Sequence, residues 1–404
     1  MNVLFLTVLQ TNDISERGIY TDLMRKFRDE GHNVFIVSPI ERKYNQQTRL
    51  IQQDGVTILQ IKTPNIQKTN LIEKGLATLI LPYLYLWNIR RNFDSIQFDL
   101  LLYSTPPITF TKVVRYFKTK GSIVSYLLLK DIFPQNAVDL NLIKKNSLLH
   151  KYFRREEKKM YSVSDFIGCM SPSNLNYILV HNKDIDASKV EVCPNSVEVG
   201  VSSFNDLKFV DIRRKYKLPL DSVVFIYGGN LGKPQGLDFL LEILESNIDL
   251  KDRYFLIVGT GTESTKIKKW FEAHNSNNAQ LIDSLPKVEY DQLLPACDVG
   301  LIFLDSAFTI PNYPSRLLSY LENKMPILAA TDRVSDIGII AQENNYGFFS
   351  ENGNLTDFNN KIERFIAHKD LLIEMGVNGY NFLNENYTVN NSYSIIMKHF
   401  QSNV

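Results

Sequence analysis

The sequence is poor in cysteine, with three in 404 residues, and Cys169, Cys193 and Cys297 stand far apart without a CxxC pair. This pattern argues against a disulfide framework or a zinc site and is typical of a protein in a reducing compartment. The six histidines have no ligand spacing, and the GxSxG, HExxH and P-loop motifs are absent. The sequence therefore gives no support to a hydrolase triad or a bound metal ion.

Targeting signals and long apolar runs are also lacking. Residues 1–13 have no basic n-region and run directly into an apolar strand pattern, so we expect no signal peptide. The densest apolar stretch, 71–93, contains Pro82 and is too short to span a bilayer. Its aromatic residues and the flanking Arg90 and Arg91 predict an amphipathic helix on an anionic membrane surface, with a helix packed on a sheet as the alternative.

Charge is distributed unevenly along the chain. Residues 1–200 contain 26 Lys and Arg against 19 Asp and Glu, although the whole chain has a net charge of only +1. Most of the excess lies in 60–120, where nine basic residues meet three acidic ones. Such a patch could face nucleic acid, an anionic membrane or a phosphorylated substrate, or it could be an ordinary solvated surface. We expect no nucleic-acid partner, because no recognition module is present.

The composition, 44% apolar and 22% charged, is that of a soluble globular protein, and the length fits two or three domains. Short apolar, β-rich runs alternate with helical patterns in two series, which predicts two doubly wound parallel sheets. The runs of the first series are 2–9, 34–37, 56–61, 100–103, 122–129, 166–170 and 190–193. Those of the second are 223–227, 254–258, 280–282, 299–303 and 326–329.

The fold class is therefore α/β, with two Rossmann-like domains facing a cleft. Residues 194–205 are polar and aperiodic, so we place the N-terminal domain at 1–197 and the second domain at 206–385. Residues 386–404 predict a terminal helix that packs back on the first domain. Because ligands of open α/β sheets bind at the carboxyl ends of the strands, the loops at those ends are the candidate sites.

The stretch 222–241, SVVFIYGGNLGKPQGLDFLL, predicts a strand, a glycine loop and a helix. The loop contains Gly229, Asn230, Gly232 and Lys233. Its backbone N–H groups and the following helix N-terminus are suited to a phosphate, and the lysine to neutralising a diphosphate. The alternative is a tight turn whose glycines serve packing alone.

Two further stretches carry candidate chemistry. In 313–330, YPSRLLSYLENKMPILAA, Arg316 begins a helix, where a cation is unfavourable unless an anion binds, and Ser315 and Ser319 offer hydroxyls to a ribose or phosphate. In 130–140, KDIFPQNAVDL, Lys130 and Asp131 follow a strand. They could orient a hydroxyl or balance a diphosphate, or form a structural ion pair.

Weaker signals complete the set of candidate residues. Gly259 and Gly261 close a strand and could admit a nucleotide, although a plain turn is the simpler interpretation. The DxD-like pair Asp184 and Asp186 lies in a polar loop, so we interpret it as surface rather than as a metal site.

Taken in order, these stretches resemble the retaining family-four glycosyltransferases of the GT-B fold, and most closely the bacterial capsule and O-antigen N-acetylfucosamine (L-fucosamine) transferases. YGGNLGKPQGLDFLL is similar to the donor-phosphate loop, KDIFPQNAVDL to the "RDLWPES" segment and CPNSV to "PNGVD". YPSRLLSYLENKMPILAA is similar to "PSKLFEYMAAGKPVLA". The resemblance covers nearly the whole chain.

The chain departs from the family pattern at its charged positions. Asn230 and Gln235 stand where the family usually carries Arg and Lys, and Pro311 and Ser319 stand where it carries two glutamates. Lys130 occupies the position of the family's histidine in the catalytic cleft. The usual carboxylate contacts to sugar and ribose are therefore missing.

The resemblance implies sugar transfer with retention from a nucleotide diphosphate donor to an undecaprenyl-diphosphate-linked saccharide, and it favours UDP as the nucleotide. It assigns Lys130 and Asp131 to the catalytic step, and Gly18, Gln135 and Asn136 to the acceptor. The residues implied for the donor diphosphate are Gly229, Asn230, Gly232, Lys233, Ser315 and Arg316. Those implied for the ribose, base or sugar are Gly259, Gly261, Pro286, Tyr313 and Ser319.

The same resemblance implies a cytoplasmic protein, peripheral on the inner face of the cell membrane through 71–93, with no cofactor and no metal. Two alternatives stay open. One is a nucleotide-sugar epimerase of the same fold, and the other is a non-catalytic scaffold that binds nucleotide sugar.

Overall fold

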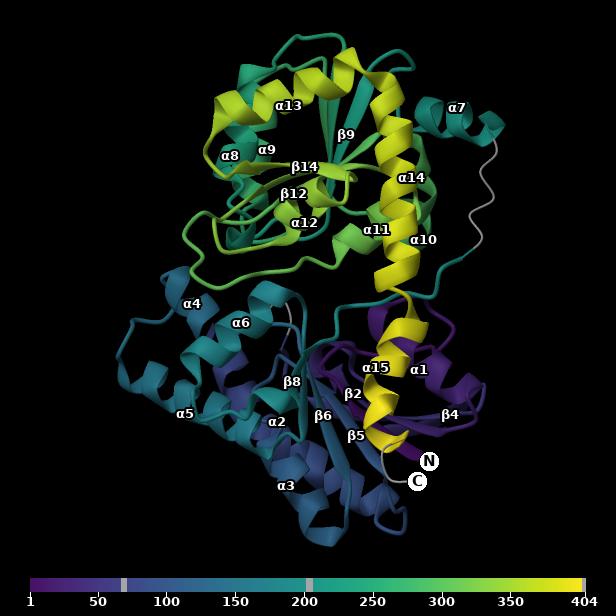
Figure 1. The fold of residues 1–404 in the computed structure, drawn as a ribbon, viewed down its shortest axis with the longest axis vertical. Coiled ribbons are helices and arrows are strands. Elements are labelled where there is room, and N and C mark those ends of the chain that lie inside the picture. The colour runs from purple at the N-terminus through teal and green to yellow at the C-terminus, as the bar shows by residue number, and fades with distance from the viewer. Residues whose placement is uncertain (67–70, 201–205, 402–404) are drawn as a thin grey trace. The chain divides into compact units, whose positions relative to one another are not determined.

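The computed structural model describes residues 1–66, 71–200 and 206–401, which form two compact units (Figure 1). Unit 1 comprises Met1–Glu198 and Val389–Val404, and unit 2 comprises Val199–Thr388. Helix α15 (Val389–Gln401) packs on α1 (Ile19–Asp29), which confirms the expected return of the chain end to the first domain. Residues 402–404 of the expected terminal helix lie outside the described residues.

The sheet of unit 1 has the strand order β3-β4-β2-β1-β5-β6-β7-β8, and every neighbouring pair is parallel except β3 and β4. The strands are β1 (Asn2–Leu6), β2 (Asn33–Glu41), β3 (Arg49–Gln53), β4 (Val56–Thr63), β5 (Leu100–Ser104), β6 (Val124–Leu129), β7 (Phe166–Cys169) and β8 (Val190–Val192). The sequence did not predict β3. It is a polar, largely exposed edge strand that pairs with β4 through the Asp54–Gly55 turn and has no apolar run to mark it.

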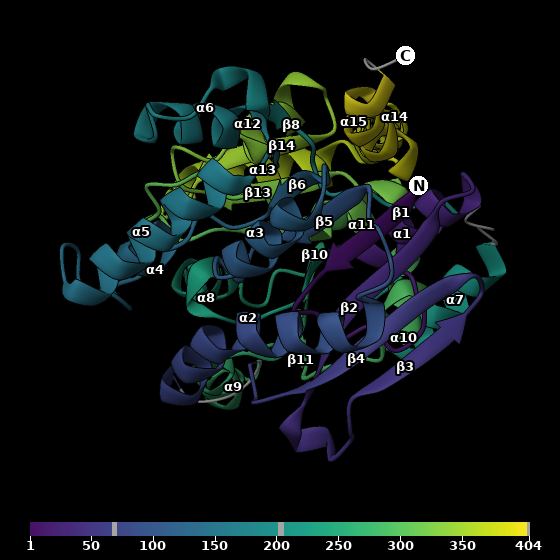
Figure 2. The ribbon, with the colours of Figure 1, turned by 90° about the horizontal axis from the view of Figure 1, so that it is seen from below.

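Helices cover both faces of this sheet. Phe5 pairs in register with Ile36, so Phe5 and Phe35 point to opposite faces. The Phe5 ring contacts Tyr20 of α1 at 5.1 Å between centroids, and Phe35 contacts Phe93 of α2 at 5.3 Å. The remaining helices of the unit are α2 (Leu71–Phe93, beside β4 in Figure 2), α3 (Thr111–Lys120), α4 (Gln135–Asp139), α5 (Leu148–Val163) and α6 (Pro172–His181), with short 3-10 turns at Arg42–Tyr44 and Ala187–Lys189.

Unit 2 contains a fully parallel sheet of order β11-β10-β9-β12-β13-β14. Its strands are β9 (Val223–Gly228), β10 (Arg253–Val258), β11 (Ala279–Ile282), β12 (Val299–Phe303), β13 (Ile327–Thr331) and β14 (Gly347–Glu351). Its helices are α7 (Asp206–Lys215), η3 (Lys233–Gln235), α8 (Asp238–Ser246), α9 (Ser264–Ala273), α10 (Lys287–Leu293), η4 (Leu294–Ala296), α11 (Arg316–Glu322), α12 (Ile337–Glu343), α13 (Leu355–Ala367) and α14 (Lys369–Asn386). The sequence did not predict β14. The prediction of two doubly wound parallel sheets is confirmed.

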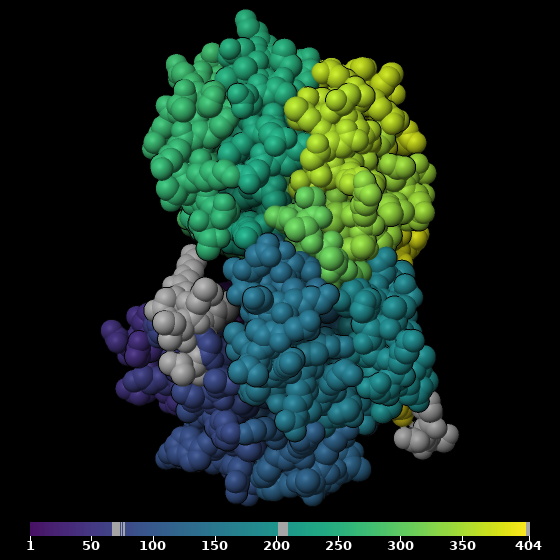
Figure 3. Space-filling model, turned by 90° about the vertical axis from the view of Figure 1, so that its left-hand side faces the viewer, coloured from purple at the N-terminus to yellow at the C-terminus, as the bar shows by residue number. Residues whose placement is uncertain are grey.

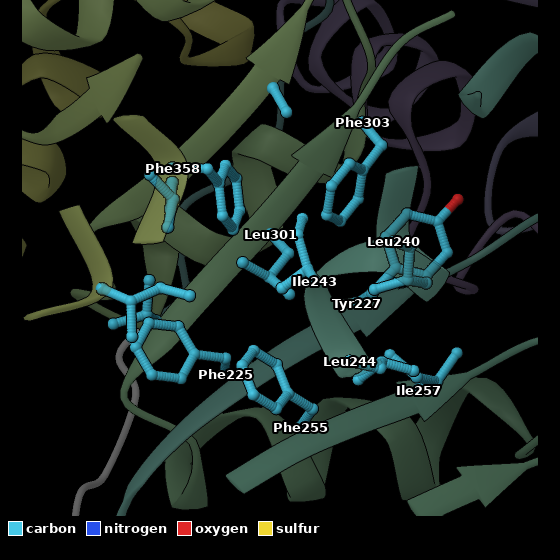
Figure 4. Packing of buried hydrophobic residues seen from close by; sticks show 14 of the residues in the cluster. Phe225, Tyr227, Leu240, Ile243, Leu244, Phe255, Ile257, Leu301, Phe303 and Phe358 are labelled. Carbon is cyan, nitrogen blue, oxygen red and sulfur yellow. The ribbon is translucent and has the colours of Figure 1, made fainter. Parts of the chain in front are cut away.

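The core of unit 2 fixes the strand ends that carry the candidate site. Figure 4 shows Phe225 of β9 beside Phe255 of β10, with centroids 5.5 Å apart, under the α8 side chains Leu240 and Ile243. All of these side chains are buried. Since burying apolar surface stabilises the folded state by about 25 cal/mol per Å², this packing holds the strands in place. On the other face, a Cβ on Gly300 would lie 2.3 Å from the Tyr320 ring, so α11 approaches β12 closely.

Candidate functional site

The glycine loop of unit 2 joins β9 to η3 and is fixed by backbone hydrogen bonds to the loop after β10. Gly229 N–H donates to the Val258 carbonyl at 2.9 Å, and Leu231 N–H donates to the Thr260 carbonyl at 3.0 Å. These bonds extend the β9–β10 pairing beyond the end of the sheet. The loop is therefore preorganised by its neighbour before any ligand binds.

Gly259 and Gly261 are explained by this contact. A Cβ on Gly259 would lie 1.8 Å from the Gly229 carbonyl oxygen, and a Cβ on Gly261 would lie 2.2 Å from the Leu231 carbonyl oxygen. Because backbone atoms cannot yield as a flexible side chain can, only glycine fits at both positions. Their first role is to let the two loops pack together, and a nucleotide contact stays a prediction.

Asn230 and Gln235, which replace the cations of the resembling family, bind each other. The Gln235 Oε1 atom accepts hydrogen bonds from Asn230 Nδ2 at 3.2 Å and from Gly232 N–H at 3.1 Å. The N–H groups of Leu231 and Gly232 are thus engaged within the protein, although the sequence suggested that the amides of 230–233 hold a diphosphate. Lys233 follows this closed loop and is exposed to solvent.

Arg316 reaches this loop from the first residue of α11. Its guanidinium lies over the Tyr227 ring, with Cζ 4.4 Å from the centroid, and its Nη2 atom is 3.3 Å from the position of a Cβ on Gly229. Its Nη1 atom is buried and has no hydrogen-bond partner among the described residues. A buried charged donor without an acceptor is costly, and guanidinium is well shaped for phosphate oxygens. The geometry therefore fits an anion at the glycine loop.

Two tyrosines that the sequence did not predict support the loop from behind. The Tyr290 hydroxyl of α10 occupies the place of a Cβ on Gly228, at 1.8 Å, and the Tyr320 hydroxyl of α11 accepts the Gly228 N–H at 3.2 Å. Burial raises the pKa of Tyr290 and raises that of Tyr320 to about 12. Both phenols are therefore neutral at physiological pH. The first glycine of the loop was the available signal, since a glycine there leaves room for a ring.

The other predicted donor residues are placed differently. Ser315 is exposed at the N-cap of α11, Ser319 is half-buried one turn later, and Pro286 directly precedes α10. Tyr313 is buried, and its hydroxyl is hydrogen-bonded to the Tyr387 hydroxyl. The structure thus gives Tyr313 a packing role inside unit 2 rather than a position at the glycine loop.

In unit 1, Lys130 and Asp131 follow β6 as expected, and one hydroxyl fixes both. Their backbone N–H groups donate to Thr105 Oγ1 at 2.8 Å and 3.0 Å. Thr105 follows the neighbouring strand β5, so the pairing of β5 with β6 brings it there. Thr105 has no local sequence signal, because the contact spans 25 residues.

Burial shifts the pKa values of Lys130 and of the nearby Tyr20. It lowers the pKa of Lys130 to about 8, against the opposing influence of the Cys193 and Cys169 thiols. Burial also raises the pKa of Tyr20 in α1, and the charge of Asp131 raises it further. The three cysteines of the chain are buried free thiols. Lys130 is therefore mostly protonated at neutral pH and loses its proton as the pH rises through about 8.

Gly18 lies at the start of α1, and its N–H donates to Asp22 Oδ1 at 2.8 Å. Asp22 also receives the Glu198 N–H at 3.0 Å and pairs with Arg25 at 2.7 Å. This buried carboxylate, which the sequence did not single out, ties the helix start to the last residue of the first segment of unit 1.

Gln135 and Asn136 begin the short helix α4. Gln135 Nε2 donates to Asp139 at 2.7 Å, whereas Asn136 Oδ1 is buried with no hydrogen-bond partner among the described residues. Such an acceptor is available to a ligand hydroxyl or a water molecule. Of these two acceptor-side candidates, Asn136 has the stronger structural support.

The DxD-like pair does not assemble as a metal site. Asp184 pairs with Lys158 at 3.3 Å, and Asp186 caps a 3-10 turn by accepting the Ser188 N–H at 3.0 Å. In the described part of the chain, no group of three or more His, Cys, Asp or Glu side chains could hold a metal ion. Among the described helices, none has the length and apolarity needed to cross a membrane.

Residues 209–382 match the family described as Glycosyl transferases group 1. The match lies within unit 2. The matched range runs from α7 to α14 and includes the glycine loop and Arg316.

Similar proteins extend the comparison to the whole chain. The chain is 24% identical over 296 residues to the probable glycosyltransferase WbjE of Pseudomonas aeruginosa, covering 71% of this chain and 70% of WbjE. It is similar in structure to sucrose-phosphate synthase of Thermosynechococcus elongatus, with a TM-score of 0.74 and 12% identity over 99% and 98% of the two chains. It also resembles Anabaena HepE in complex with UDP-glucose, with a TM-score of 0.72 and 14% identity over 100% of both chains. The expected GT-B fold is confirmed.

Proposed function

We propose that this protein is a retaining, metal-independent glycosyltransferase. Its donor is a UDP-linked sugar, which we expect to be an N-acetylated deoxy-hexosamine, and its acceptor is an undecaprenyl-diphosphate-linked saccharide of bacterial capsule or O-antigen synthesis. The single observation behind this proposal is the buried Arg316 Nη1 atom without a partner at the glycine loop. The UDP-glucose bound by HepE is the support for a uridine nucleotide.

In the proposed reaction, the bond between the anomeric carbon and the donor phosphate oxygen breaks, and a bond to the acceptor hydroxyl oxygen forms on the same face. The departing diphosphate carries negative charge, so fixed positive groups stabilise the transition state. Arg316 supplies a permanent charge inside the site, and Lys233 supplies a second charge from the exposed side. The leaving phosphate oxygen accepts the proton of the acceptor hydroxyl, so no strong protein base is required.

Unit 1 supplies the acceptor side in this proposal. Asp131 orients the acceptor hydroxyl, and Lys130 offers a cation whose position is set by the hydrogen bond of its backbone to Thr105. Asn136 offers its unpartnered oxygen to a saccharide hydroxyl, with Gly18 leaving space at the start of α1.

We also propose that the protein works in the cytoplasm, peripheral on the inner membrane face, through α2. Four apolar or aromatic side chains of this helix are exposed at helical spacing, among them Trp87 at 60% exposure. They are Leu79, Ile80, Tyr83 and Trp87. Arg91 lies over the Trp87 ring and Lys112 over the Tyr83 ring, at 5.6 Å and 3.7 Å, so cations flank the apolar face. Aromatic and basic residues together suit the headgroup region.

A thermal-shift screen with nucleotide sugars, followed by a transfer assay, tests this function. We expect UDP and one UDP-sugar to raise the melting temperature, because a ligand that binds only the native state stabilises it. The matching UDP-sugar should then release UDP only when a lipid-linked acceptor is added, and NMR of the product should show the donor's anomeric configuration.

Other outcomes favour the alternatives. A new isomeric nucleotide sugar formed without acceptor would identify an epimerase. Donor binding without turnover across a panel of lipid-linked acceptors would identify a scaffold, which the absence of family glutamates at Pro311 and Ser319 makes worth testing. If no nucleotide sugar shifts the melting temperature, the proposed function fails.

A further inference from the structure

A basic cavity lies along α5, and its lining includes none of the residues assigned above to the donor or acceptor. Helix α5 runs along the surface of unit 1 (Figures 1 and 3). The cavity has a volume of about 610 Å³ and five cationic side chains in its lining. The lining residues are Asn146, His150, Lys151, Arg154, Arg155, Lys158, Lys159, Ser162 and Asp184.

The charges of this cavity are only partly neutralised. Arg154 pairs with Glu157 at 2.5 Å, and Lys159 pairs with Glu156 at 2.5 Å. The single carboxylate of the lining, Asp184, lies 3.3 Å from Lys158.

Two cations of the lining have no carboxylate partner among the described residues. In the described part of the chain, Lys151 and Arg155 have neither an ion pair nor a side-chain hydrogen bond, and both are exposed. They are four residues apart on one face of α5, with Lys158 following one turn later. The cavity therefore presents to an external anion two exposed cations that no carboxylate of the described residues neutralises.

Exposed apolar residues border the same cavity. Leu148 at the start of α5 is 87% exposed, and Leu149 and Tyr152 are also exposed. Together they form an exposed apolar patch at the start of a helix whose other exposed residues are mostly basic. A soluble anion gains nothing from contact with these apolar side chains, whereas the acyl chains of a lipid can bury them.

The border continues onto α2 through a contact between three helices. Lys112 of α3 donates a hydrogen bond to the Tyr83 hydroxyl of α2 and lies over its ring. Helix α3 also packs against α5, the helix that carries Tyr152. Helix α3 thus joins the exposed face of α2 to the helix that lines the basic cavity.

We infer that the α5 cavity is a binding site for the phosphate headgroup of an anionic phospholipid, with Lys151 and Arg155 as its principal donors. Charge complementarity selects a phosphate, and the adjoining apolar side chains select a lipid surface as its source. This inference rests on the proposed function in taking the membrane as the partner, but it adds a separate site with its own selectivity. Helix α2 contributes apolar insertion, and α5 contributes recognition of negative charge.

Vesicle flotation of the full chain tests this division. The probes are vesicles of phosphatidylcholine alone and vesicles that also contain phosphatidylglycerol. The double variant K151Q/R155Q should lower partitioning onto the phosphatidylglycerol vesicles by about thirtyfold, as expected for two basic residues near such a surface. The matched control R214Q/K269Q removes two exposed cations from α7 and α9 of unit 2 and should change partitioning less than threefold or so.

A second variant separates this site from the proposed contact of α2. Trp87→Ala should weaken binding to both kinds of vesicle, whereas K151Q/R155Q should leave the residual binding to pure phosphatidylcholine unchanged. Circular dichroism melts of all variants establish that the fold is retained.

The inference is overturned if K151Q/R155Q partitions like the parent protein or loses no more than the matched control. It is also overturned if calorimetry shows that inorganic phosphate binds the parent protein and displaces it from vesicles, since the cavity would then serve a soluble phosphate. Sugar transfer to a water-soluble acceptor analogue should be unchanged in K151Q/R155Q. Loss of the lipid site and loss of the proposed function are therefore distinguishable.

Discussion

The glycine loop of unit 2 and the Lys130–Asp131 turn of unit 1 each follow the carboxyl end of a parallel strand, β9 and β6 respectively, yet they are built differently. The glycine loop is held by backbone bonds to a neighbouring loop, and Arg316 of α11, whose charge is permanent, reaches it. The turn is held by one threonine hydroxyl and carries a lysine whose pKa is about 8.

This difference has a physical meaning for the proposed reaction. A donor diphosphate has the same charge in every turnover, so a rigid loop with a permanent cation suits it. An acceptor site must select one hydroxyl of a saccharide. Because that hydroxyl is neutral, the site does not require a permanent cation. The comparison therefore predicts that unit 2 tolerates little change and that unit 1 responds to pH.

The largest expected effect comes from the backbone contact of the glycine loop. Gly259→Ala would place a Cβ 1.8 Å from the Gly229 carbonyl oxygen, so the two loops must separate. We expect a stability loss of about 3 kcal/mol, the upper end for overpacking, and weaker binding of UDP. Denaturant unfolding and calorimetry measure both.

Gly121→Ala in unit 1 is the control for this substitution, because a Cβ there meets no atom within 4 Å. Equal stability of the two alanine variants would show that the loops of unit 2 are not locked together.

Arg316 should give the next largest effect. Removing its guanidinium in Arg316→Ala should weaken UDP binding by about 1–3 kcal/mol, the usual range for a charged hydrogen bond. Arg316→Lys should fall between, because an ammonium keeps the charge but not the planar stacking on Tyr227. Isothermal titration with UDP gives the affinities. An Arg316→Ala variant with the parent's affinity would remove the basis of the donor site.

Much of this comparison was predictable from the sequence, because the strands and the glycine loop are local patterns. Apolar runs bounded by glycines located β9 and β10, and the position of Arg316 at a helix start was already unfavourable without an anion. Tyr290 and Thr105 were not predictable. Each acts across a long stretch of chain, on Gly228 and on the Lys130–Asp131 turn respectively, and only the order of strands brings them there.

The edge strand β3 was also not predictable from local sequence patterns. β3 is polar and exposed, so the alternation that marks a half-buried strand is absent. For Tyr313, a motif position suggested a ligand contact, and the structure shows its hydroxyl bonded to that of Tyr387, so the ligand contact stays a prediction. Motif similarity places a residue on an element but does not fix the direction of its side chain.

The pH dependence of transfer should show the contrast between the two cations at moderate size. The pKa of Lys130 is about 8, so its charge is lost as pH rises through that value, while Arg316 stays charged. We expect kcat/KM to fall severalfold above this pH and UDP affinity to stay constant. In Lys130→Arg the fall should move to higher pH.

Unfolding does not explain such a fall. A lysine in the unfolded chain has a pKa of roughly 10.4, so between about 8 and this value the unfolded state binds more protons at Lys130 than the folded state. Its contribution to stability therefore rises with pH in this window. A flat rate profile across it would remove Lys130 from the catalytic side.

Lys233 should give the smallest effect, which sharpens the comparison within unit 2 itself. Lys233 and Arg316 are both proposed to bind the donor diphosphate. Lys233 is exposed, however, whereas the Arg316 Nη1 atom is buried. Because solvent screens exposed charges, Lys233→Ala should weaken UDP binding by less than about 1 kcal/mol, and the loss should disappear at high salt. Titrations at low and high ionic strength test this, with Arg316→Ala as the reference that salt should change little. If Lys233→Ala costs as much as Arg316→Ala and resists salt, the loop must close over the diphosphate so that Lys233 becomes buried with its ligand, and the glycine loop would then be less rigid than its backbone bonds imply.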